Sequence, residues 1–346
     1  MTSISARLAA VLACLVVVSA VSSCGTVKLP ASAAAATWHL APSQPAASGE
    51  LRGVSFPDAS HGWTAGGVSN DLFGTNDGGL GWREVPVRLP GAQQPFFGLG
   101  LVFTDDHNGW LAGDALAHTT DGGATWSSQA PANLSSDEGY YGLCFADADH
   151  GWVAGADSSH KRTLIDFTTD GGNSWQASAP LPPGGISAIT FANDQRGWAV
   201  GDVAGFKPRI LATSDGGRTW VTVYHGPGNL LDAVAFADQQ HGWAVGEGMA
   251  LRTTDGGVTW SAIKAFDHTL LITVASIDPQ HVWVAGQGGI WASGNGGVSW
   301  RQVWKGNRIY SLAFSDPAHG WAVGSTNLGG GPGNNMPGLV LTYGAN

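Results

Sequence analysis

Short apolar runs separated by polar and glycine-rich turns fill most of the chain, and Asp232–Ile263 shows this pattern with the shortest connections. The runs AVAF, GWAVG, ALRTT and VTWSAI are separated there by ADQQH, by the two-residue step EG and by DGG. Runs of this length, rich in β-branched and aromatic residues, predict four antiparallel strands joined by tight turns. Four such strands cannot bury both faces of their sheet alone, so we expect copies of the unit to stack on one another.

Two sequence signatures repeat along the chain. The first is F-x-D-x-x-(H)-G-W-x-(A/V)-G, with its Trp at positions 63, 110, 152, 198, 243, 283 and 321. The second is T-x-D-G-G-x-(T/S)-W, with its Trp at positions 82, 126, 175, 220, 260 and 300. Successive copies lie 38 to 49 residues apart, a period typical of four-stranded propeller blades.

The last copy of the first signature is not followed by the second signature, and the missing piece is found near the N-terminus. AATWHLAPSQPAASGELRGVSF parallels GGATWSSQAPANLSSDEGYYGLCF, which gives Trp38 the place of the second-signature Trp. We therefore expect an all-β fold over residues 37–346, a seven-bladed β-propeller of four-stranded antiparallel blades. An N-terminal strand around Trp38 would complete the last blade, because a ring of blades is stable only when its first and last members are joined.

The N-terminus has the features of a targeting segment. Arg7 precedes the apolar stretch Leu8–Val21, which ends in the sequence VSSC. The sequence VSSC resembles the lipobox of bacterial lipoproteins. The resemblance implies a signal peptide over residues 1–23, a lipidated Cys24 and an Ala-rich tether over residues 24–36. The expected location is the outer face of the bacterial cytoplasmic membrane, in the cell envelope. The alternative is an ordinary signal peptide in which Cys24 is incidental.

Charge and cysteine content narrow the choice of partners. The chain has 16 Lys and Arg against 26 Asp and Glu, a net charge of −10, which argues against a nucleic-acid partner. With Cys14 in the signal peptide and Cys24 lipidated, Cys144 is left without a disulfide partner and is expected to be a small buried hydrophobe. We expect a monomeric propeller held together by packing.

The second signature resembles the Asp-box, or BNR repeat, from about Trp38 to the C-terminus. Asp-boxes occur in sialidases, xyloglucan-cleaving propellers, sortilin-type receptors and the photosynthesis system II assembly factor family. The GW-x-(V/A)-G step followed by TTDGG-x-TW is most similar to the last of these. That resemblance implies a seven-bladed extracytoplasmic propeller that binds proteins; the sequence shows no pigment or quinone signature, and we expect no cofactor.

The repeated polar residues are expected to be structural. The Asp that opens D-G-G can accept hydrogen bonds from its own turn, and Asn can do the same. These residues are Asp77, Asp121, Asp170, Asp215, Asp255 and Asn295. A His also recurs near the end of the turn between strands one and two, at positions 61, 150, 241, 281 and 319. Metal binding is the alternative there, but a ring would hold equivalent positions far apart, so we expect no metal site.

Candidate binding residues lie on one face of the expected ring. The turns between strands one and two and between strands three and four emerge on what we call the turn face. The opposite face carries the loops between strands two and three and the connections between blades, and we call it the loop face. Its irregular segments are where binding residues tend to lie. A basic and aromatic group there comprises Tyr140, Tyr141, Lys161, Arg162, Lys207 and Arg209. Solvated loops are the alternative.

A second candidate is the mouth of the central channel. The residues eleven positions before each first-signature Trp should start the innermost strands, and among them Arg52, Tyr141, Asp232 and Tyr310 could ring one end of the channel. The alternative for these residues is packing at strand ends.

Three functions remain open. The first is a membrane-anchored scaffold that binds a protein partner through its loop face, and it is not an enzyme. The second is a glycoside hydrolase of the Asp-box type, which needs paired carboxylates or a Tyr–Glu pair. None of Glu50, Glu84, Glu138 and Glu247 has an obvious Tyr partner in the sequence. The third is a glycan-binding lectin.

Overall fold

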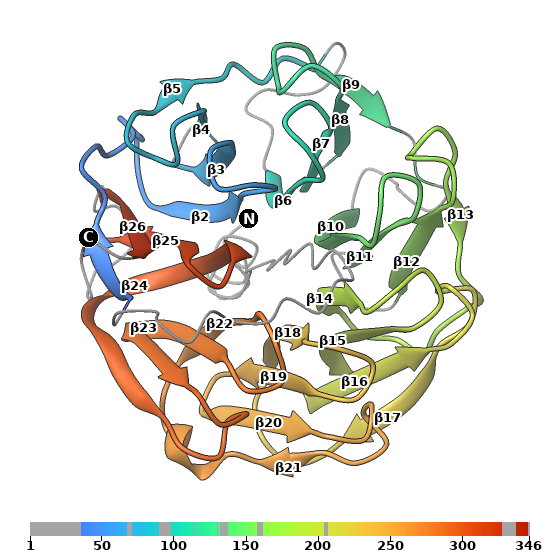
Figure 1. Cartoon of the computed structure of the whole chain (residues 1–346). Coiled ribbons are helices and arrows are strands. Elements are labelled where there is room, and N and C mark those ends of the chain that lie inside the picture. The colour runs from blue at the N-terminus through green and yellow to red at the C-terminus, as the bar shows by residue number, and fades with distance from the viewer. Residues whose placement is uncertain are drawn as a thin grey trace, which may run out of the picture.

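The computed structural model describes residues 36–67, 71–89, 98–113, 115–129, 131, 138–157, 162–203, 207–326 and 337–344. In these ranges the regular secondary structure is β-strand, apart from one 3-10 helix, η1 (Lys264–Phe266). The sheets stand in a ring around a central axis, as Figure 1 shows. The expectation of an all-β propeller is confirmed. The signal peptide over residues 1–23, Cys24, most of the tether and Lys161 lie outside the described residues.

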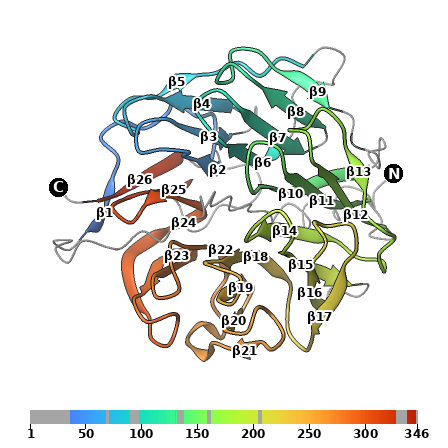
Figure 2. The same cartoon turned by 45° about the vertical axis from the view of Figure 1, so that its right-hand side comes forward.

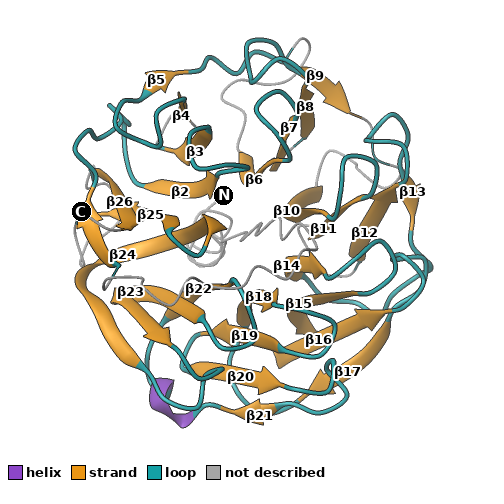
Figure 3. Cartoon of the chain, viewed as in Figure 1, coloured by secondary structure: helices purple, strands orange, loops and turns teal. Residues whose placement is uncertain are grey.

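Five sheets have four antiparallel strands each, in chain order from the centre of the ring outward (Figures 1 and 3). The first sheet contains β2 (Leu51–Ser55), β3 (Gly62–Gly66), β4 (Asp71–Thr75) and β5 (Arg83–Glu84). The second contains β6 (Gly98–Phe103), β7 (Gly109–Gly113), β8 (Leu116–Thr119) and β9 (Ser127–Gln129). The third contains β10 (Glu138–Phe145), β11 (Gly151–Asp157), β12 (Thr163–Thr168) and β13 (Gln176–Ala177). The fourth contains β14 (Ile186–Phe191), β15 (Gly197–Val203), β16 (Lys207–Thr213) and β17 (Val221–His225). The fifth contains β18 (Leu231–Phe236), β19 (Gly242–Gly246), β20 (Met249–Thr253) and β21 (Ser261–Ala262).

The number of blades differs from the sequence prediction: the described residues form six sheets, so the expectation of seven blades is wrong. The sixth sheet has six strands, in the order β1-β26-β25-β24-β23-β22. Their bounds are β22 (Leu271–Ser276), β23 (Val282–Ser293), β24 (Arg301–Asp316), β25 (His319–Ser325), β26 (Gly338–Gly344) and β1 (Thr37–Leu40).

The cause of the merger is the 16-residue strand β24. Its first part, from Arg301 to Arg308, pairs with β23, and its second part, from Arg308 to Asp316, pairs with β25. No loop separates the two parts, and the chain changes direction through Gly306 and Asn307, whose φ angles are 87° and 64°. The sixth and seventh sequence repeats therefore share one hydrogen-bonded sheet.

The N-terminal strand lies at the edge of this sheet. β1 pairs antiparallel with β26, with Trp38 opposite Tyr343. Trp38 packs edge-on against Phe314, at 5.9 Å between ring centroids and 78° between planes. The second-signature Trp82 packs in the same way on Phe56 of its own sheet, at 6.1 Å and 89°. Trp38 thus occupies the position that the second-signature Trp occupies elsewhere.

Each first-signature Trp that stacks on a Phe joins its own sheet to the next one. Trp198, for example, stacks on Phe236 at 3.4 Å, and its indole N–H donates to the carbonyl of Gly256, 3.1 Å away in the following D-G-G turn. The ring is closed by the same contact: Trp321 stacks on Phe56 at 3.6 Å and donates to the carbonyl of Gly78 at 2.9 Å. The D-G-G turn therefore serves the neighbouring sheet as well as its own strands.

In six of the seven repeats a Gly precedes the first-signature Trp, and the Phe of the same repeat explains it. A Cβ on Gly242 would lie 2.5 Å from the ring of Phe236, so no larger residue fits. In the sixth repeat Ser276 stands in place of that Phe, and Val282, fully buried, stands in place of the Gly. Phe266 of η1 provides the missing ring, packing edge-on against Trp300 at 5.1 Å.

No helix within the described ranges is long and apolar enough to cross a membrane.

Candidate functional site

The Asp-box turns form networks of hydrogen bonds that are complete within each turn. The Asp255 carboxylate accepts from the Thr253 hydroxyl at 2.8 Å, from the Thr259 N–H at 2.9 Å and from the Thr259 hydroxyl at 2.6 Å. The Thr253 hydroxyl in turn accepts from the N–H of Gly257. These bonds, first of all the one from the Thr259 side chain, lower the pKa of Asp255 to about 2. Asn295 takes the same place in the sixth repeat, bonded to Ser293 and Ser299.

The recurring His residues are bound within their own turns. Each of the five has its Nδ1 at 2.8 to 2.9 Å from the Asp three residues earlier, in the pairs His61–Asp58, His150–Asp147, His241–Asp238, His281–Asp278 and His319–Asp316. In the second repeat Asn108 takes the place of the His, and its Nδ2 donates to Asp105 at 2.8 Å. The hydrogen bonds of the turn account for these residues.

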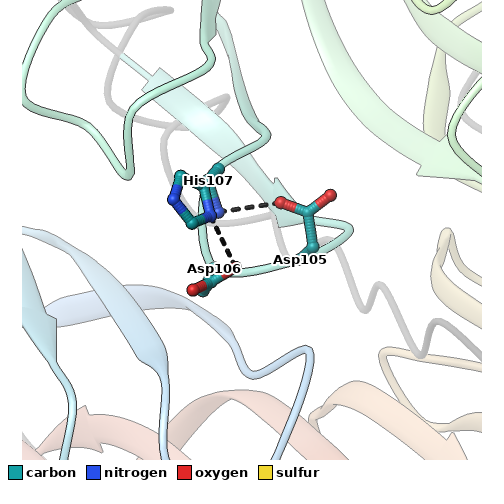
Figure 4. Close-up of side chains that lie close together, drawn as sticks. All are labelled: Asp105, Asp106 and His107. Atoms are coloured by element: carbon teal, nitrogen blue, oxygen red, sulfur yellow. Dashed lines mark hydrogen bonds and ion pairs between the residues drawn. The ribbon is translucent and has the colours of Figure 1, made fainter.

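One group in the described part of the chain brings three ligand-type side chains together: Asp105, Asp106 and His107 (Figure 4). The repeat pattern does not point to His107, since it lies outside the repeated His position. Its Nδ1 lies 2.6 Å from Asp106, and its backbone N–H donates to Asp105 at 2.8 Å. The carboxylate of Asp106 raises the pKa of His107. All three lie in one short turn, and their mutual hydrogen bonds explain the grouping.

The turn chemistry predicts how stability depends on pH. Because folding lowers the pKa of Asp255 from 3.8 to about 2, its contribution is complete above pH 4 and is lost as the pH falls toward 2. We expect Asp255→Asn to be slightly less stable at neutral pH and to lose less stability on acidification. Urea unfolding at pH 7, 4 and 2.5 measures this. An unchanged pH dependence in the variant would mean that the carboxylate is not held ionised by its turn.

The innermost strands share an irregularity at the loop face. Each has a one-residue register shift near its loop-face end, for example between Leu51 and Gly53 in β2 and between Ile309 and Ser311 in the second part of β24. The extra residues are Arg52, Leu99, Tyr141, Ser187, Asp232, Ile272 and Tyr310. These are the positions eleven residues before each first-signature Trp. A bulge re-aims the side chain of its extra residue, so we call these residues the bulge ring. Their strands surround the centre in Figure 1.

Burial removes several candidates from the surface that a partner could touch. Asp232 is 1% exposed and Tyr310 is 6% exposed, and Tyr140 is fully buried with its hydroxyl donating to Asp166. Arg209 is also buried: its guanidinium donates to the carbonyl of Pro182 and to the Thr163 hydroxyl, both at 3.0 Å. Burial lowers the pKa of Arg209, and the charge of Asp202 opposes that shift.

The expected basic group on the loop face is therefore reduced. Arg209 ties β16 to the neighbouring sheet instead of facing solvent. Arg162 and Lys207 are exposed, and Tyr141 is partly exposed. The sequence did not reveal this difference, because Lys207 and Arg209 both lie in β16 and only the position of the neighbouring sheet decides which one it covers.

The structure assembles a different group where the first and last innermost strands meet. Tyr310 donates its hydroxyl to Glu50 Oε2 at 2.6 Å, and Glu50 also pairs with Arg52. The guanidinium carbons of Arg52 and Arg308 lie 5.7 and 5.4 Å from the centroid of the Tyr310 ring. We call Glu50, Arg52, Arg308 and Tyr310 the closure cluster. The sequence shows no obvious Tyr partner for any Glu, because Glu50 and Tyr310 are 260 positions apart along the chain and meet only in the fold.

The chemistry of the closure cluster favours binding over nucleophilic catalysis. Burial, with the hydrogen bond to Glu50 next, raises the pKa of Tyr310 well above its usual value, so that the phenol keeps its proton at neutral pH. Two guanidinium groups against one carboxylate leave the cluster with a positive charge on a protein of net charge −10. Such a group can hold a carboxylate through charge-assisted hydrogen bonds.

The propeller fold and the repeated T-x-D-G-G turns define an Asp-box β-propeller. The chain belongs to the family of the photosynthesis system II assembly factor YCF48, whose family description matches residues 31–130 and 227–310, together more than half of its length. The resemblance seen in the sequence is thus confirmed. A comparison with curated proteins finds no match.

Solved structures share the fold at low sequence identity. The structure described as "YCF48 bound to D1 peptide" is 22% identical, with a TM-score of 0.69 over 92% of this chain and 99% of that one. YCF48 from Cyanidioschyzon merolae is 19% identical, with a TM-score of 0.65 over 89% and 98%. The GH74 enzyme of Niastella koreensis is 14% identical, with a TM-score of 0.59 over 83% of this chain and 52% of that one. At such identities the likeness shows the fold alone.

Proposed function

We propose that this protein is a non-enzymatic binding scaffold that holds a segment of a partner protein on its loop face. Membership of an assembly-factor family supports a protein partner, and a similar structure is described as bound to a D1 peptide. The observation that carries the proposal is the closure cluster, in which Arg52 and Arg308 flank Tyr310 at the mouth of the ring. Both arginines are partly exposed, whereas the Tyr310 ring is buried, and arginine is among the residues that most often dominate protein interfaces.

The charge of the cluster indicates the kind of segment it would hold. An extended peptide with a carboxylate side chain or a free C-terminus could accept hydrogen bonds from the guanidinium groups. The partly exposed Tyr141, elsewhere on the bulge ring, offers an aromatic surface for the same segment. No photosynthetic partner follows from the residues, and the identity of the partner is to be found by experiment.

The proposed location is the outer face of the bacterial cytoplasmic membrane, with Cys24 as the lipid attachment site. It is supported by the lipobox-like sequence VSSC after an apolar stretch, and two or more acyl chains are enough for stable anchoring. Incorporation of labelled palmitate into the wild-type chain but not into Cys24→Ala is the expected result. Equal labelling of both chains, or of neither, would refute the anchor.

The second candidate function, recognition or hydrolysis of an anionic glycan, is favoured by one observation, the Tyr310–Glu50 pair. Sialidases use a Tyr as nucleophile, but the raised pKa of Tyr310 works against that role. The match covers only 52% and 48% of the GH74 enzymes, so about half of each has no counterpart in it. A glycan array together with hydrolysis assays distinguishes the two functions, and turnover of a sialoside or β-glucan would contradict the scaffold proposal.

The role of the cluster is tested by replacing Arg308 with glutamine. Because a hydrogen bond to a charged group contributes about 1.5–3 kcal/mol, we expect about ten- to a hundredfold weaker capture of the partner from detergent-solubilised membranes. Arg218→Gln is the matched control, since Arg218 is an exposed arginine on the turn face. Equal capture by both variants, measured by quantitative mass spectrometry, would remove the cluster from the binding site.

A further inference from the structure

One guanidinium group of the closure cluster is paired with a carboxylate and the other is not. The cluster lies where β2 and the second part of β24 run side by side (Figures 1 and 2). Arg52 donates from Nε to Glu50 Oε1 at 2.9 Å, and its Nη2 donates to the same oxygen. No carboxylate of the described residues lies within ion-pair distance of Arg308, and its Nε is buried without an acceptor. Arg308 is therefore the arginine of the cluster that has donors to offer.

Glu50 is held in its position by bonds of its side chain and of its backbone. Its Oε2 accepts from the Tyr310 hydroxyl at 2.6 Å, and its backbone carbonyl accepts from the N–H of Gly67 at 2.8 Å. A phenol has one proton to donate, so the hydroxyl of Tyr310 has none left for a ligand. The side chain of Glu50 is 14% exposed. Glu50 is thus a carboxylate ligand that the chain itself supplies to Arg52 and Tyr310.

A second carboxylate close to this segment is engaged elsewhere. Asp71 Oδ2 accepts from the N–H and from the hydroxyl of Ser48, both at 2.7 Å, and no ion pair of the described residues links Asp71 to Arg52 or Arg308. The groups in mutual contact in the cluster are therefore two guanidinium groups, one carboxylate and a neutral phenol. One positive charge remains, and the pairing of Arg52 with Glu50 places it at Arg308.

A ligand that reaches the cluster meets this single uncompensated charge. A guanidinium group presents its donors in a planar fork that matches one carboxylate, and one carboxylate neutralises Arg308. A phosphate, or two adjacent carboxylates, would bring a second negative charge to a partly buried place where no cation is left to pair with it, and an unpaired charge is costly there. The carboxylate of Glu50 would also repel that second charge.

We propose that Glu50 is the specificity-determining residue of the closure cluster. By neutralising Arg52, it restricts the cluster to a peptide segment that presents one carboxylate, and Arg308 receives that carboxylate. The two arginines then have different roles: Arg52 is a positioning residue that holds Glu50, and Arg308 contacts the ligand. This inference rests on the proposed function, since it specifies which kind of acidic segment the loop face holds.

The test uses the full chain and a library of immobilised synthetic peptides. Each random sequence is made in four forms that differ at two adjacent positions only: two glutamines, one glutamine with one glutamate, two glutamates, or one glutamine with one phosphoserine. The wild type is compared with Glu50→Gln and Arg308→Gln. Glutamine keeps the size of Glu50 and an oxygen that can accept from Arg52, so the Glu50→Gln chain is expected to fold. Glu84→Gln is the matched control, because Glu84 is exposed on β5 and its replacement changes the net charge equally.

We expect the wild type and Glu84→Gln to bind the form with one glutamate most tightly. In Glu50→Gln the preference should move toward the two doubly charged forms. Removal of one unit charge about 6 Å from a ligand charge, at an effective dielectric constant between about 20 and 80, changes the ratio of affinities by about three- to a hundredfold. Arg308→Gln should weaken binding of every charged form.

An unchanged order of the four forms in Glu50→Gln, or a change no larger than in Glu84→Gln, would overturn the proposal. Equal loss of binding to all four forms in Glu50→Gln would overturn it as well, because Glu50 would then act only by holding Arg52 and Tyr310 in place. If the wild type and Arg308→Gln retained the same peptides equally, the proposed function of the cluster would itself be refuted, so the two failures can be told apart.

Discussion

Trp321→Ala is expected to destabilise the ring by about 3–5 kcal/mol, the usual cost of truncating a buried tryptophan. The variant loses the stack on Phe56 at 3.6 Å and the hydrogen bond to the Gly78 carbonyl at 2.9 Å. Both contacts join the last part of the chain to the first. We therefore expect β1 and β26 to lose hydrogen-exchange protection before the other strands do, in addition to a lower urea midpoint.

Trp63→Ala is the matched control for ring closure. Trp63 makes the same pair of contacts, stacking on Phe103 at 3.6 Å and donating to the Gly122 carbonyl at 3.2 Å, but between successive sheets of the chain. It should cost a similar free energy of unfolding without selective exchange in β1 and β26. If Trp321→Ala cost less than about 1 kcal/mol, or opened no strand selectively, the contact would not be what closes the ring.

The second large effect is expected at Gly242. Gly242→Val places a Cβ 2.5 Å from the Phe236 ring, and overpacking of this kind costs about 1–3 kcal/mol or more. Phe236→Ser alone should cost about 3–5 kcal/mol, because it removes the stack on Trp198 at 3.4 Å. In the double variant the clash is gone, and the introduced valine side chain fills part of the space left by the ring.

We therefore expect the double variant to be less destabilised than the sum of the single variants, by about 1–3 kcal/mol. The sixth repeat is the natural precedent, since Ser276 and Val282 occur there together. Urea unfolding of the wild type, the two single variants and the double variant gives the coupling energy. Costs that add within about 0.5 kcal/mol would mean that the ring of Phe236 does not determine the Gly in this signature.

The sequence was sufficient for most of the architecture because the repeat is local. The order of the strands, the turn bonds of Asp255 and the place of Arg52 at the start of an innermost strand all follow from spacing within one copy. The place of Trp38 followed from comparing the two ends of the chain. The sequence shows that Ser276 replaces the Phe and Val282 replaces the Gly of the other repeats. It does not show why the two replacements occur together, because the contact between these two positions is evident only in the structure, where the Phe236 ring lies against Gly242.

The features that the sequence did not predict depend on contacts between distant segments or on continuity of hydrogen bonding. The merger of two repeats in one sheet arises because β24 continues through Gly306 and Asn307, which read as an ordinary connection. Glu50 and Tyr310 meet only where the ring closes. In the sequence Arg209 resembles a surface cation, but in the structure the neighbouring sheet covers it. The spacing of residues within one repeat carries no information about contacts between distant repeats.

The loop face, around the bulge ring, is proposed to hold a protein partner, and photo-crosslinking in native membranes tests this role most directly. A photoreactive amino acid is placed at Tyr141 or Ser187 on the bulge ring and at Asn173 or Arg218 on the turn face. We expect both bulge-ring positions to form an adduct with the same protein and the turn-face positions to form none. Adducts with lipid or cell-wall polymer alone at Tyr141 and Ser187, or the same protein adduct from both faces, would contradict the proposed role.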